Sequence, residues 1–533
     1  MSFRSPFPDV EIPEKNVYDF LFGDLTDEDL DRTALIDGPS GAVTTYRSLV
    51  GQINGVAGAL AARGVQVGDV VAVHSPNVPA FASVFHGILR AGATATTINA
   101  LYTAEDIAKQ LTDSSATMIF TVSPLLPQAE AAADEVGIPA DKVIVLDGAE
   151  GHPSLKDLLT QGASAPDVDF DPATHLAVLP YSSGTTGRPK GVMLTHRNLV
   201  ANVSQIEPNM GADHNDVLLA VLPFFHIYGM TVLLNLGLKV RASLVTMPKF
   251  DLEQFLSLTT EKKITYLFIA PPVAVALAKH PMVDQYDISS VRMVFSGAAA
   301  LDENLGNAVA KRLHTKVRQG YGMSELSPVS HAMPFGADDM PLSSCGTAVP
   351  NTENKIVDPA TGEEVSYPEK GSGKVSDPGE LWIKGPNVMA GYLNNDSATA
   401  ETLDSDGYLH TGDIAVVDDA GCVSIVDRLK ELIKYKGYQV PPAELESLLL
   451  THPQIADAAV IGVLDDEGEE VPKAFVVLQQ GAELSEAEVM TFVSEKVSPH
   501  KKVRKVEFID VVPKSASGKI LRKDLRAAEK TPI

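Results

Sequence analysis

Short apolar runs rich in β-branched residues alternate with helix-like segments over the first 300 residues. The runs predict strands at 70–73, 118–122, 142–146, 265–269 and 291–295. Between the first two, residues 77–90 repeat their apolar side chains at helical spacing. Strands that alternate with helices of about 10–15 residues are typical of βαβ units and mainly parallel sheets. We therefore predict an α/β fold for this part of the chain.

The pattern changes after residue 340. Between 340 and 426 the strands become short and are punctuated by Gly and Pro, as in GELWIKGP and GCVSIVD, which predicts an antiparallel β subdomain. The last hundred residues return to an α+β pattern, with a helix expected at 442–451 and strands at 458–463 and 474–478. No repeat of 20–50 residues is present.

One apolar stretch, residues 217–238, is long enough to span a membrane, which takes about 20 residues. Pro223, His226 and Gly229 interrupt it, and Pro223 followed by His226 is typical of a strand end that turns into a loop. We predict a buried strand, a functional loop and a buried helix here, and no membrane span.

Composition narrows the classes of partner. The 533 residues correspond to about three to four folding units. Asp and Glu outnumber Lys and Arg by 69 to 43, and the net charge of −26 argues against binding to nucleic acid or to anionic lipid. A hydrophobic share of 44% is ordinary for a globular protein with large cores, which excludes disorder throughout. Two cysteines and no recognisable targeting segment make a cytoplasmic location the expectation.

The segment YSSGTTGRPKGV, residues 181–192, carries the strongest chemical signal. It follows an apolar strand at 176–179, and its glycines, hydroxyls and Lys190 are suited to wrap an anion. Pro189 precedes Lys190 and Gly191 follows it, so the segment does not match the Walker A pattern of P-loop NTPases. The sequence also has no G-x-S-x-G, C-x-x-C, H-E-x-x-H or G-x-G-x-x-G motif, which disfavours serine hydrolases, zinc enzymes and Rossmann dehydrogenases.

Six further segments follow this loop in order. They are LPFFHIYG (222–229), SGAAAL (296–301), QGYGMSE (319–325), YLHTGD (408–413), DRLKELIKYKGYQV (427–440) and PKSASGKI (513–520). Together with the loop, this set resembles the adenylate-forming enzymes, which include acyl-CoA synthetases, firefly luciferase and peptide-synthetase adenylation domains. Within that superfamily the chain is most similar to the 4-coumarate–CoA ligase branch.

The resemblance implies a nucleotide site. Asp413, which the TGD pattern predicts to end a strand, would accept both ribose hydroxyls, and Glu325 with Thr186 would hold Mg²⁺ through hard oxygen ligands. The residues that the resemblance assigns to ATP or AMP are Ser182, Ser183, Gly184, Thr185, Thr186, Lys190, Ala299, Gln319, Gly320, Tyr321, Ser324, Asp413, Arg428, Lys434 and Gln439.

It also implies three catalytic residues, Lys519, His226 and Glu325. Lys519 would stabilise the negative charge that builds up when the substrate carboxylate attacks the α-phosphorus, and His226 would lie at the carboxylate end of the acyl pocket. Two further sets are implied. The acyl pocket would be lined by Tyr228, Met230, Ser296, Gly297, Gly320, Pro328 and Val329, and CoA would be contacted by Lys249, Lys436 and Gly437.

The same resemblance predicts two domains. Residues 1–427 would form a large N-terminal domain of βαβ sheets with a β subdomain, and residues 428–533 a small mobile α+β domain. A hinge at 427–430, centred on Lys430, would let the small domain rotate, so that the segment 434–439 replaces Lys519 for thiol attack.

The predicted function is an ATP-dependent acid–thiol ligase that forms an acyl-adenylate and then an acyl-CoA thioester from a 4-coumarate or cinnamate-type acid. A medium-chain fatty acid is the alternative substrate, because hydrophobic pockets discriminate weakly. A luciferase-type oxidase is not marked by any residue, and a peptide-synthetase adenylation domain would need an amino-group-binding Asp. A non-catalytic nucleotide-binding protein would be expected to lose Lys519 or Glu325, and both are present. The expected ligands are the acid, ATP, Mg²⁺ and CoA, and the protein would be a monomer or homodimer.

Overall fold

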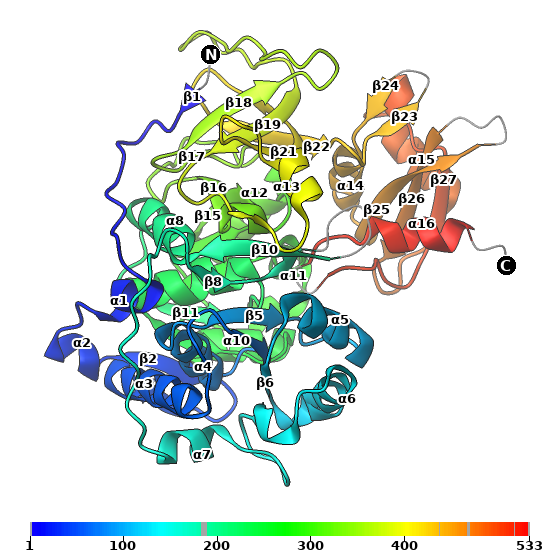
Figure 1. The fold of residues 1–533 in the computed structure, drawn as a ribbon. Helices are drawn as coiled ribbons and strands as arrows, with labels where there is room; N and C mark the ends of the chain where they lie inside the picture. Colours follow the sequence, from blue (N-terminus) through cyan, green and yellow to red (C-terminus); the bar gives the residue numbers. More distant parts are fainter. Residues whose placement is uncertain (1–2, 183–188, 436–437, 466–469, 516–517, 531–533) are drawn as a thin grey trace.

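The computed structural model describes residues 3–182, 189–435, 438–465, 470–515 and 518–530. Two large sheets with their helices and one antiparallel sheet make up the N-terminal part, and a smaller α+β unit from the last hundred residues lies beside them (Figure 1). This arrangement confirms the predicted fold class.

The first sheet is wound in both directions from β4 (Val70–His74). β5 (Thr94–Ile98) pairs with it on one side and β6 (Met118–Thr121) on the other, both parallel, and the crossovers contain α4 (Pro79–Arg90) and α5 (Ala104–Ser114). Its other strands are β7 (Val143–Val145), β8 (Leu176–Val178), β9 (Tyr181–Ser182), β10 (Lys190–Thr195) and β20 (Gly391–Tyr392). α4 begins two residues later than predicted, because the residue before Pro79 is held extended.

The second sheet brings the carboxyl ends of several parallel strands to one edge. β11 (Val217–Ala220), β13 (Tyr266–Ile269), β14 (Met293–Ser296) and β15 (Lys316–Gly322) lie side by side. Its remaining strands are β2 (Thr33–Asp37), β3 (Val43–Thr45), β12 (Ser243–Thr246), β16 (Val329–Ala332) and β17 (Thr347–Ala348). The segments 222–229, 296–301 and 319–325 lie at the carboxyl ends of β11, β14 and β15, so they converge at this edge. Ligands of open α/β sheets bind at such an edge.

The third sheet confirms the predicted antiparallel subdomain. It consists of β1 (Phe3–Arg4), β18 (Glu353–Val357), β19 (Gly379–Lys384), β21 (Leu409–Val417) and β22 (Val423–Arg428). Adjacent strands of this sheet pair antiparallel throughout, and β22 leads directly toward the C-terminal unit.

Helices cover both large sheets. Those of the N-terminal part not yet named are α1 (Val17–Phe22), α2 (Asp27–Asp31), α3 (Tyr46–Ala62), α6 (Leu126–Val136), α7 (Leu155–Thr160), α8 (His196–Met210), α9 (Leu236–Lys239), α10 (Leu252–Glu261), α11 (Pro271–Lys279), α12 (Glu303–Leu313) and α13 (Asp396–Thr402). Several begin with a side-chain cap; Thr195, for example, forms a reciprocal capping box with Asn198 at the start of α8.

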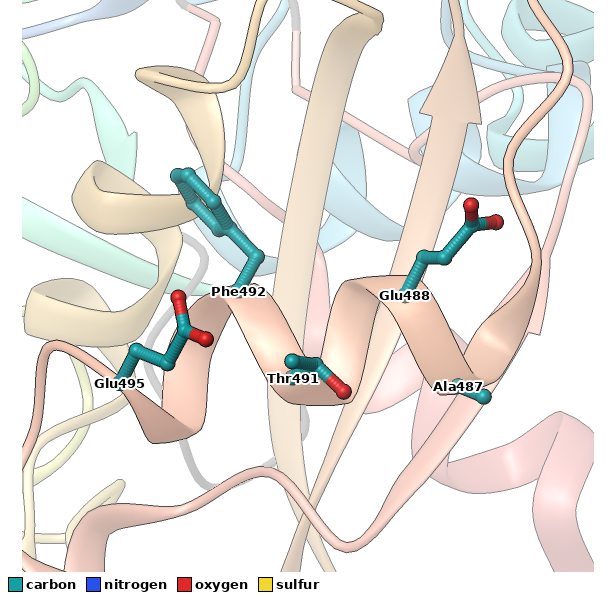
Figure 2. A pocket seen from close by; sticks show the side chains of 5 residues that line it. All are labelled: Ala487, Glu488, Thr491, Phe492 and Glu495. Carbon is teal, nitrogen blue, oxygen red and sulfur yellow. The ribbon is translucent and has the colours of Figure 1, made fainter.

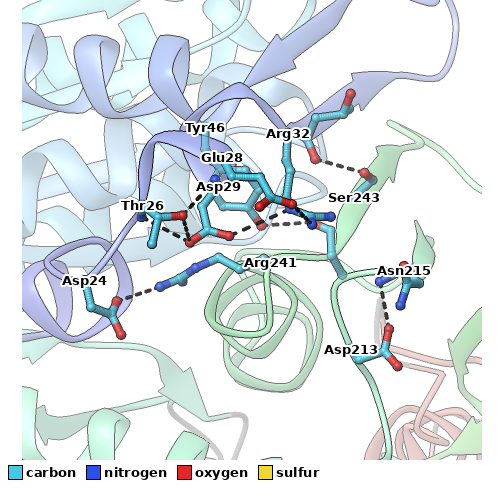
Figure 3. Close-up of polar contacts among 12 residues, drawn as sticks. Asp24, Thr26, Glu28, Asp29, Arg32, Tyr46, Asp213, Asn215, Arg241 and Ser243 are labelled. Atoms are coloured by element: carbon cyan, nitrogen blue, oxygen red, sulfur yellow. Dashed lines mark hydrogen bonds and ion pairs between the residues drawn. The ribbon is translucent and has the colours of Figure 1, made fainter.

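Polar contacts fasten the N-terminal helices to the second sheet (Figure 3). Arg241, between α9 and β12, donates to the Asp24 carboxylate at 2.6 Å and to the Leu21 carbonyl at 2.8 Å. The hydroxyl of Tyr46 on α3 donates to the Ala242 carbonyl at 2.9 Å, and burial raises its pKa above the usual value. The largely buried Arg241 guanidinium and the Tyr46 hydroxyl thereby hold together segments that are about 200 residues apart in the sequence.

The apolar stretch 217–238 folds as predicted. β11 is followed by a loop, a π-helical turn η3 (Gly229–Asn235) and α9. η3 is completely buried, and a Cβ at Gly229 would lie 2.1 Å from the Pro223 carbonyl oxygen, so only glycine fits where the loop turns back. No helix in the described part of the chain is long and apolar enough to cross a bilayer.

The C-terminal unit has its own core. A hairpin of β23 (Ile433–Tyr435) and β24 (Tyr438–Val440) accompanies a sheet of β25 (Ile455–Leu464), β26 (Glu470–Leu478) and β27 (Lys505–Phe508). Its helices are α14 (Pro442–Leu450), α15 (Glu486–Ser494) and α16 (Arg522–Lys530). A shallow hollow on α15, next to Phe492, carries none of the predicted site residues (Figure 2).

Candidate active site

Asp413 is held on two sides by its neighbours. The Tyr321 hydroxyl donates to Asp413 Oδ2 at 2.6 Å, and Arg428 Nε lies 3.4 Å from Asp413 Oδ1. Burial raises the pKa of the Asp413 carboxyl, while the Arg428 charge and the Tyr321 hydrogen bond oppose that rise. The expectation that Asp413 ends a strand is wrong: β21 continues to Val417, because its pairing with β22 extends beyond the Asp413–Arg428 pair.

Glu325 is a buried carboxylate fixed by two hydroxyls. Ser182 Oγ donates to Glu325 Oε1 at 3.1 Å, and the Tyr392 hydroxyl donates to the same oxygen at 2.8 Å. Lys190 Nζ lies 4.6 Å from the centre of the Tyr392 ring, so the two described ends of the hydroxyl-rich loop meet at Glu325. The predicted phosphate-binding residues Ser183, Gly184, Thr185 and Thr186 lie outside the described residues.

Lys519 reaches this region from the C-terminal unit. Burial lowers the pKa of its ammonium to about 8, with Arg428 acting in the same direction and Asp413, Glu431 and Glu325 acting against it. His226 has its pKa lowered to about 4, first by burial and then by the Lys519 charge, and is therefore neutral at pH 7. Lys519 therefore lies within electrostatic reach of both other predicted catalytic residues, His226 and Glu325.

A tight turn presents Lys519. Ser515 N donates to the Lys519 carbonyl at 2.8 Å, and Ser515 Oγ accepts from Lys519 N at 3.1 Å. Gly518 adopts a φ of +84°, a conformation that glycine takes without steric cost. The hydrogen bonds from Ser515 and the conformation of Gly518 therefore hold the Lys519 backbone.

Tyr228, Gly297 and Gly320 of the predicted acyl pocket meet at the sheet edge. A Cβ at Gly297 would lie 2.8 Å from the Tyr228 ring, and one at Gly320 would lie 2.9 Å from the Phe295 ring. The Tyr228 hydroxyl donates to the Phe295 carbonyl at 3.3 Å. Met230, Ser296 and Val329 are also buried, and the Pro328 carbonyl accepts from Met323 N at 3.1 Å.

Gln319 has its side-chain amide occupied by backbone. Its Oε1 accepts from Leu301 N at 3.0 Å, and its Nε2 donates to the Leu301 carbonyl at 3.3 Å and to the Leu342 carbonyl. Gln319 therefore fixes the segment that contains Ala299, which is exposed next to Ala298 with its φ of +69°. Ser324 begins the short helix η5 (Ser324–Leu326) beside Glu325.

Other predicted residues lie at the surface. Lys430 is exposed in the turn after β22, where Glu431 N donates to the Arg428 carbonyl at 3.0 Å. Lys434 is exposed on β23 and pairs through the backbone with Gln439 on β24. Lys249 is exposed after β12. Lys436 and Gly437 lie outside the described residues.

Two contributors were missed by sequence reasoning. Tyr392 binds Glu325 from 67 positions away, and Glu431 acts on Lys519 from a strand turn beside Arg428. No local spacing signals either contact, because each joins segments that are far apart in the sequence and meet only in the folded chain. Glu431 lies within the recognisable segment 427–440, and this is the only signal in the sequence that could have indicated its role.

Comparison with known proteins gives a consistent result. Profiles of the AMP-binding enzyme family and of the AMP-binding enzyme C-terminal domain match residues 25–393 and 444–519. 4-Coumarate–CoA ligase 1 from Solanum tuberosum is 44% identical over 98% of this chain and 96% of its own. 4-Coumarate–CoA ligase 5 from Oryza sativa subsp. japonica is 43% identical over 98% and 97%, respectively.

Solved structures agree with this. The anthranilate CoA ligase AuaEII in complex with anthranoyl-AMP is 27% identical, with a TM-score of 0.88 over 97% of this chain and 98% of that chain. ATP-bound MatB from Rhodopseudomonas palustris is 31% identical, with a TM-score of 0.86 over 97% and 99%. The chain therefore belongs to the family of AMP-binding enzymes that includes the 4-coumarate–CoA ligases.

Proposed function

We propose that this protein is an ATP-dependent acid–CoA ligase acting on 4-coumarate or a related cinnamate. The observation that carries the proposal is the approach of Lys519, from the C-terminal unit, to His226, Asp413 and Glu325 of the N-terminal part. A cation surrounded by buried carboxylates and a neutral imidazole suits a reaction in which negative charge develops at phosphorus. The whole-length similarity to 4-coumarate–CoA ligases supports the choice of acid.

In the first step the substrate carboxylate attacks the α-phosphorus of ATP, an O–P bond forms, and pyrophosphate leaves. Asp413 would accept the ribose hydroxyls, and the segment 297–301 held by Gln319 would receive the adenine. Lys519 would offset the charge on the α-phosphate, and the neutral His226 would donate a hydrogen bond to the carboxylate. In the second step the CoA thiol attacks the acyl carbon, giving the thioester, AMP and a proton.

Mg²⁺ fits the residues present. The described part of the chain contains no group of three or more His, Cys, Asp and Glu side chains that would form an all-protein metal site. Glu325 instead offers a single buried carboxylate, which suits an ion that is bound mainly by phosphates and water. When bound, the ion would neutralise charge on the phosphates, with Glu325 and Thr186 as its proposed protein ligands.

The second step needs a different arrangement, because the thiol must reach the carbon that Lys519 faces. We assign residues 1–427 and 428–533 to two domains, with Lys430 as the hinge between them. Rotation would withdraw Lys519 and bring the segment containing Lys434, Lys436, Gly437 and Gln439 to the adenylate. CoA would then contact Lys436, Gly437 and Lys249. We further propose a cytoplasmic location and a monomer or homodimer, and light scattering on the purified protein will test the oligomeric state.

Pyrophosphate release tests the proposal. The purified enzyme is supplied with ATP, Mg²⁺ and a panel of cinnamates, benzoates and C6–C12 fatty acids, with and without CoA. We expect the highest kcat/KM with 4-coumarate and a thioester product only when CoA is present. Turnover of C8–C12 acids without turnover of cinnamates would contradict the aryl assignment and favour a medium-chain fatty acyl-CoA ligase.

A further inference from the structure

Helix α11 meets the C-terminal unit at its first turn. Gly518, beside Lys519, packs on Ala270 and Pro272: a Cβ at Gly518 would lie 3.3 Å from the Ala270 Cβ and from two ring carbons of Pro272. α11 follows directly from the carboxyl end of β13, the edge where the candidate site lies. The helix thus supports the Lys519 turn next to the reacting groups.

The last turn of α11 makes a second contact with the same unit. Lys279 Nζ donates to the Leu450 carbonyl at 3.0 Å and to the Ile455 carbonyl at 3.4 Å. Leu450 is the last residue of α14, and carbonyls in the last turn of a helix have no partner within it. A cation at that end is favoured by the helix dipole as well as by the hydrogen bonds.

Lys279 is not needed by its own helix. Arg312 of α12 donates to the Leu277 carbonyl at 3.2 Å and to the His280 carbonyl at 2.9 Å, and so caps the end of α11. Although the Lys279 side chain remains partly exposed, loss of water around its ammonium lowers its pKa. The side chain is thus directed across to a neighbouring unit rather than along its own helix.

We propose that α11 is the docking helix of the small domain for adenylate formation, and that Lys279 is a positioning residue which holds that domain where Lys519 reaches the site. The inference rests on the proposed two-step function. Both contacts join residues on opposite sides of Lys430, so rotation about that hinge separates them. Lys279 would then favour the adenylating orientation and be released before thiol attack.

Half-reaction kinetics of the full-length enzyme test this role. The variants are Lys279→Met, which keeps the apolar stem, and Lys279→Arg, which keeps the charge. Lys311→Met, an exposed lysine in the last turn of α12, is the matched control. Adenylate formation is followed in single turnovers over a range of ATP concentrations at saturating 4-coumarate, and thioester formation is followed from synthetic 4-coumaroyl-adenylate and CoA.

We expect Lys279→Met to slow adenylate formation about fivefold, which corresponds to about 1 kcal/mol, with an unchanged KM for ATP. Its thioester formation should equal or exceed that of the wild type, and Lys279→Arg should recover most of the lost rate. Equal slowing of both steps, or a rate equal to that of Lys311→Met, would overturn the inference. A wild type that makes neither adenylate nor thioester would refute the proposed function, and this inference with it.

Discussion

Asp413 has one carboxylate oxygen on the Tyr321 hydroxyl and the other toward Arg428. Replacing it with Ala should weaken AMP binding by about 1.5–3 kcal/mol, the usual contribution of hydrogen bonds to a charged group. Isothermal titration calorimetry with AMP measures the change. Tyr321→Phe is the control: it removes one hydrogen bond from Asp413 but leaves the carboxylate, so the loss should be smaller. An unchanged AMP affinity in folded Asp413→Ala would remove Asp413 from the nucleotide site.

The lowered pKa of Lys519 predicts that the rate of the first step depends on pH. Its ammonium, with a pKa lowered to about 8, loses its proton as the pH rises through that value, and a neutral amine cannot offset phosphate charge. Because kcat/KM reports the free enzyme, kcat/KM for pyrophosphate release without CoA should fall above about pH 8. His226, with a pKa of about 4, is neutral over this range and produces no such limb. In Lys519→Arg the limb should disappear; a limb that persists unchanged would assign it to another group.

Individual site residues could be predicted only where a local motif carries them. Asp413, Glu325 and Lys519 each lie in a short recognisable segment, so the sequence identified them as candidates without information about their neighbours in space. Tyr392 and Glu431 act through contacts between segments that are distant in the sequence, and the pairing of β21 with β22 carried the strand beyond Asp413. Such contacts depend on tertiary packing, which the motifs do not encode.

At the level of elements, the strands that the hydrophobic pattern predicted are all present, with ends that differ by at most four residues. β25, for example, was expected at 458–463 and spans Ile455–Leu464, because pairing with β26 extends it at both ends. The order of strands across each sheet could not be predicted, since it is decided by crossovers. The convergence of β11, β14 and β15 at one edge therefore became visible only in the structure.

A buried ionic cluster ties α16 to the rest of the small domain. Arg522 donates to both oxygens of Glu446 and to Glu431, and all three side chains are largely buried. Arg522→Met would leave the buried Glu446 carboxylate without a cation and Glu431 with only Arg428, 3.9 Å away, which should destabilise the domain by about 3–5 kcal/mol. Amide hydrogen exchange in β25 and β26 measures this, and Lys523→Met, exposed on the same helix, is the control. Equal protection in the two variants would contradict the prediction.

At the scale of the molecule, three contacts between the C-terminal unit and the N-terminal part favour one orientation. Gly518 packs on Pro272, Lys279 binds Leu450, and Lys519 lies within electrostatic reach of His226. An enzyme with only this orientation would be suited to the first step and obstructed in the second. A two-step enzyme would therefore have to stabilise this orientation for the first step and leave it before the second.

Restricting the hinge should separate the two steps. Lys430→Pro fixes φ near −65° and removes one N–H group, so the domain should stay in the orientation described here, in which Lys519 faces the site. Adenylate formation should then remain within about threefold of the wild type, while thioester formation from supplied 4-coumaroyl-adenylate falls at least about a hundredfold, a loss typical of misplaced reacting groups. Lys430→Ala keeps backbone freedom and should leave both rates nearly unchanged.

Lys519→Ala should give the opposite pattern to Lys430→Pro, with adenylate formation slowed by about 10²–10³ and thioester formation retained. If Lys519→Ala and Lys430→Pro impaired both steps equally, a single fixed active site would describe this enzyme better than domain rotation.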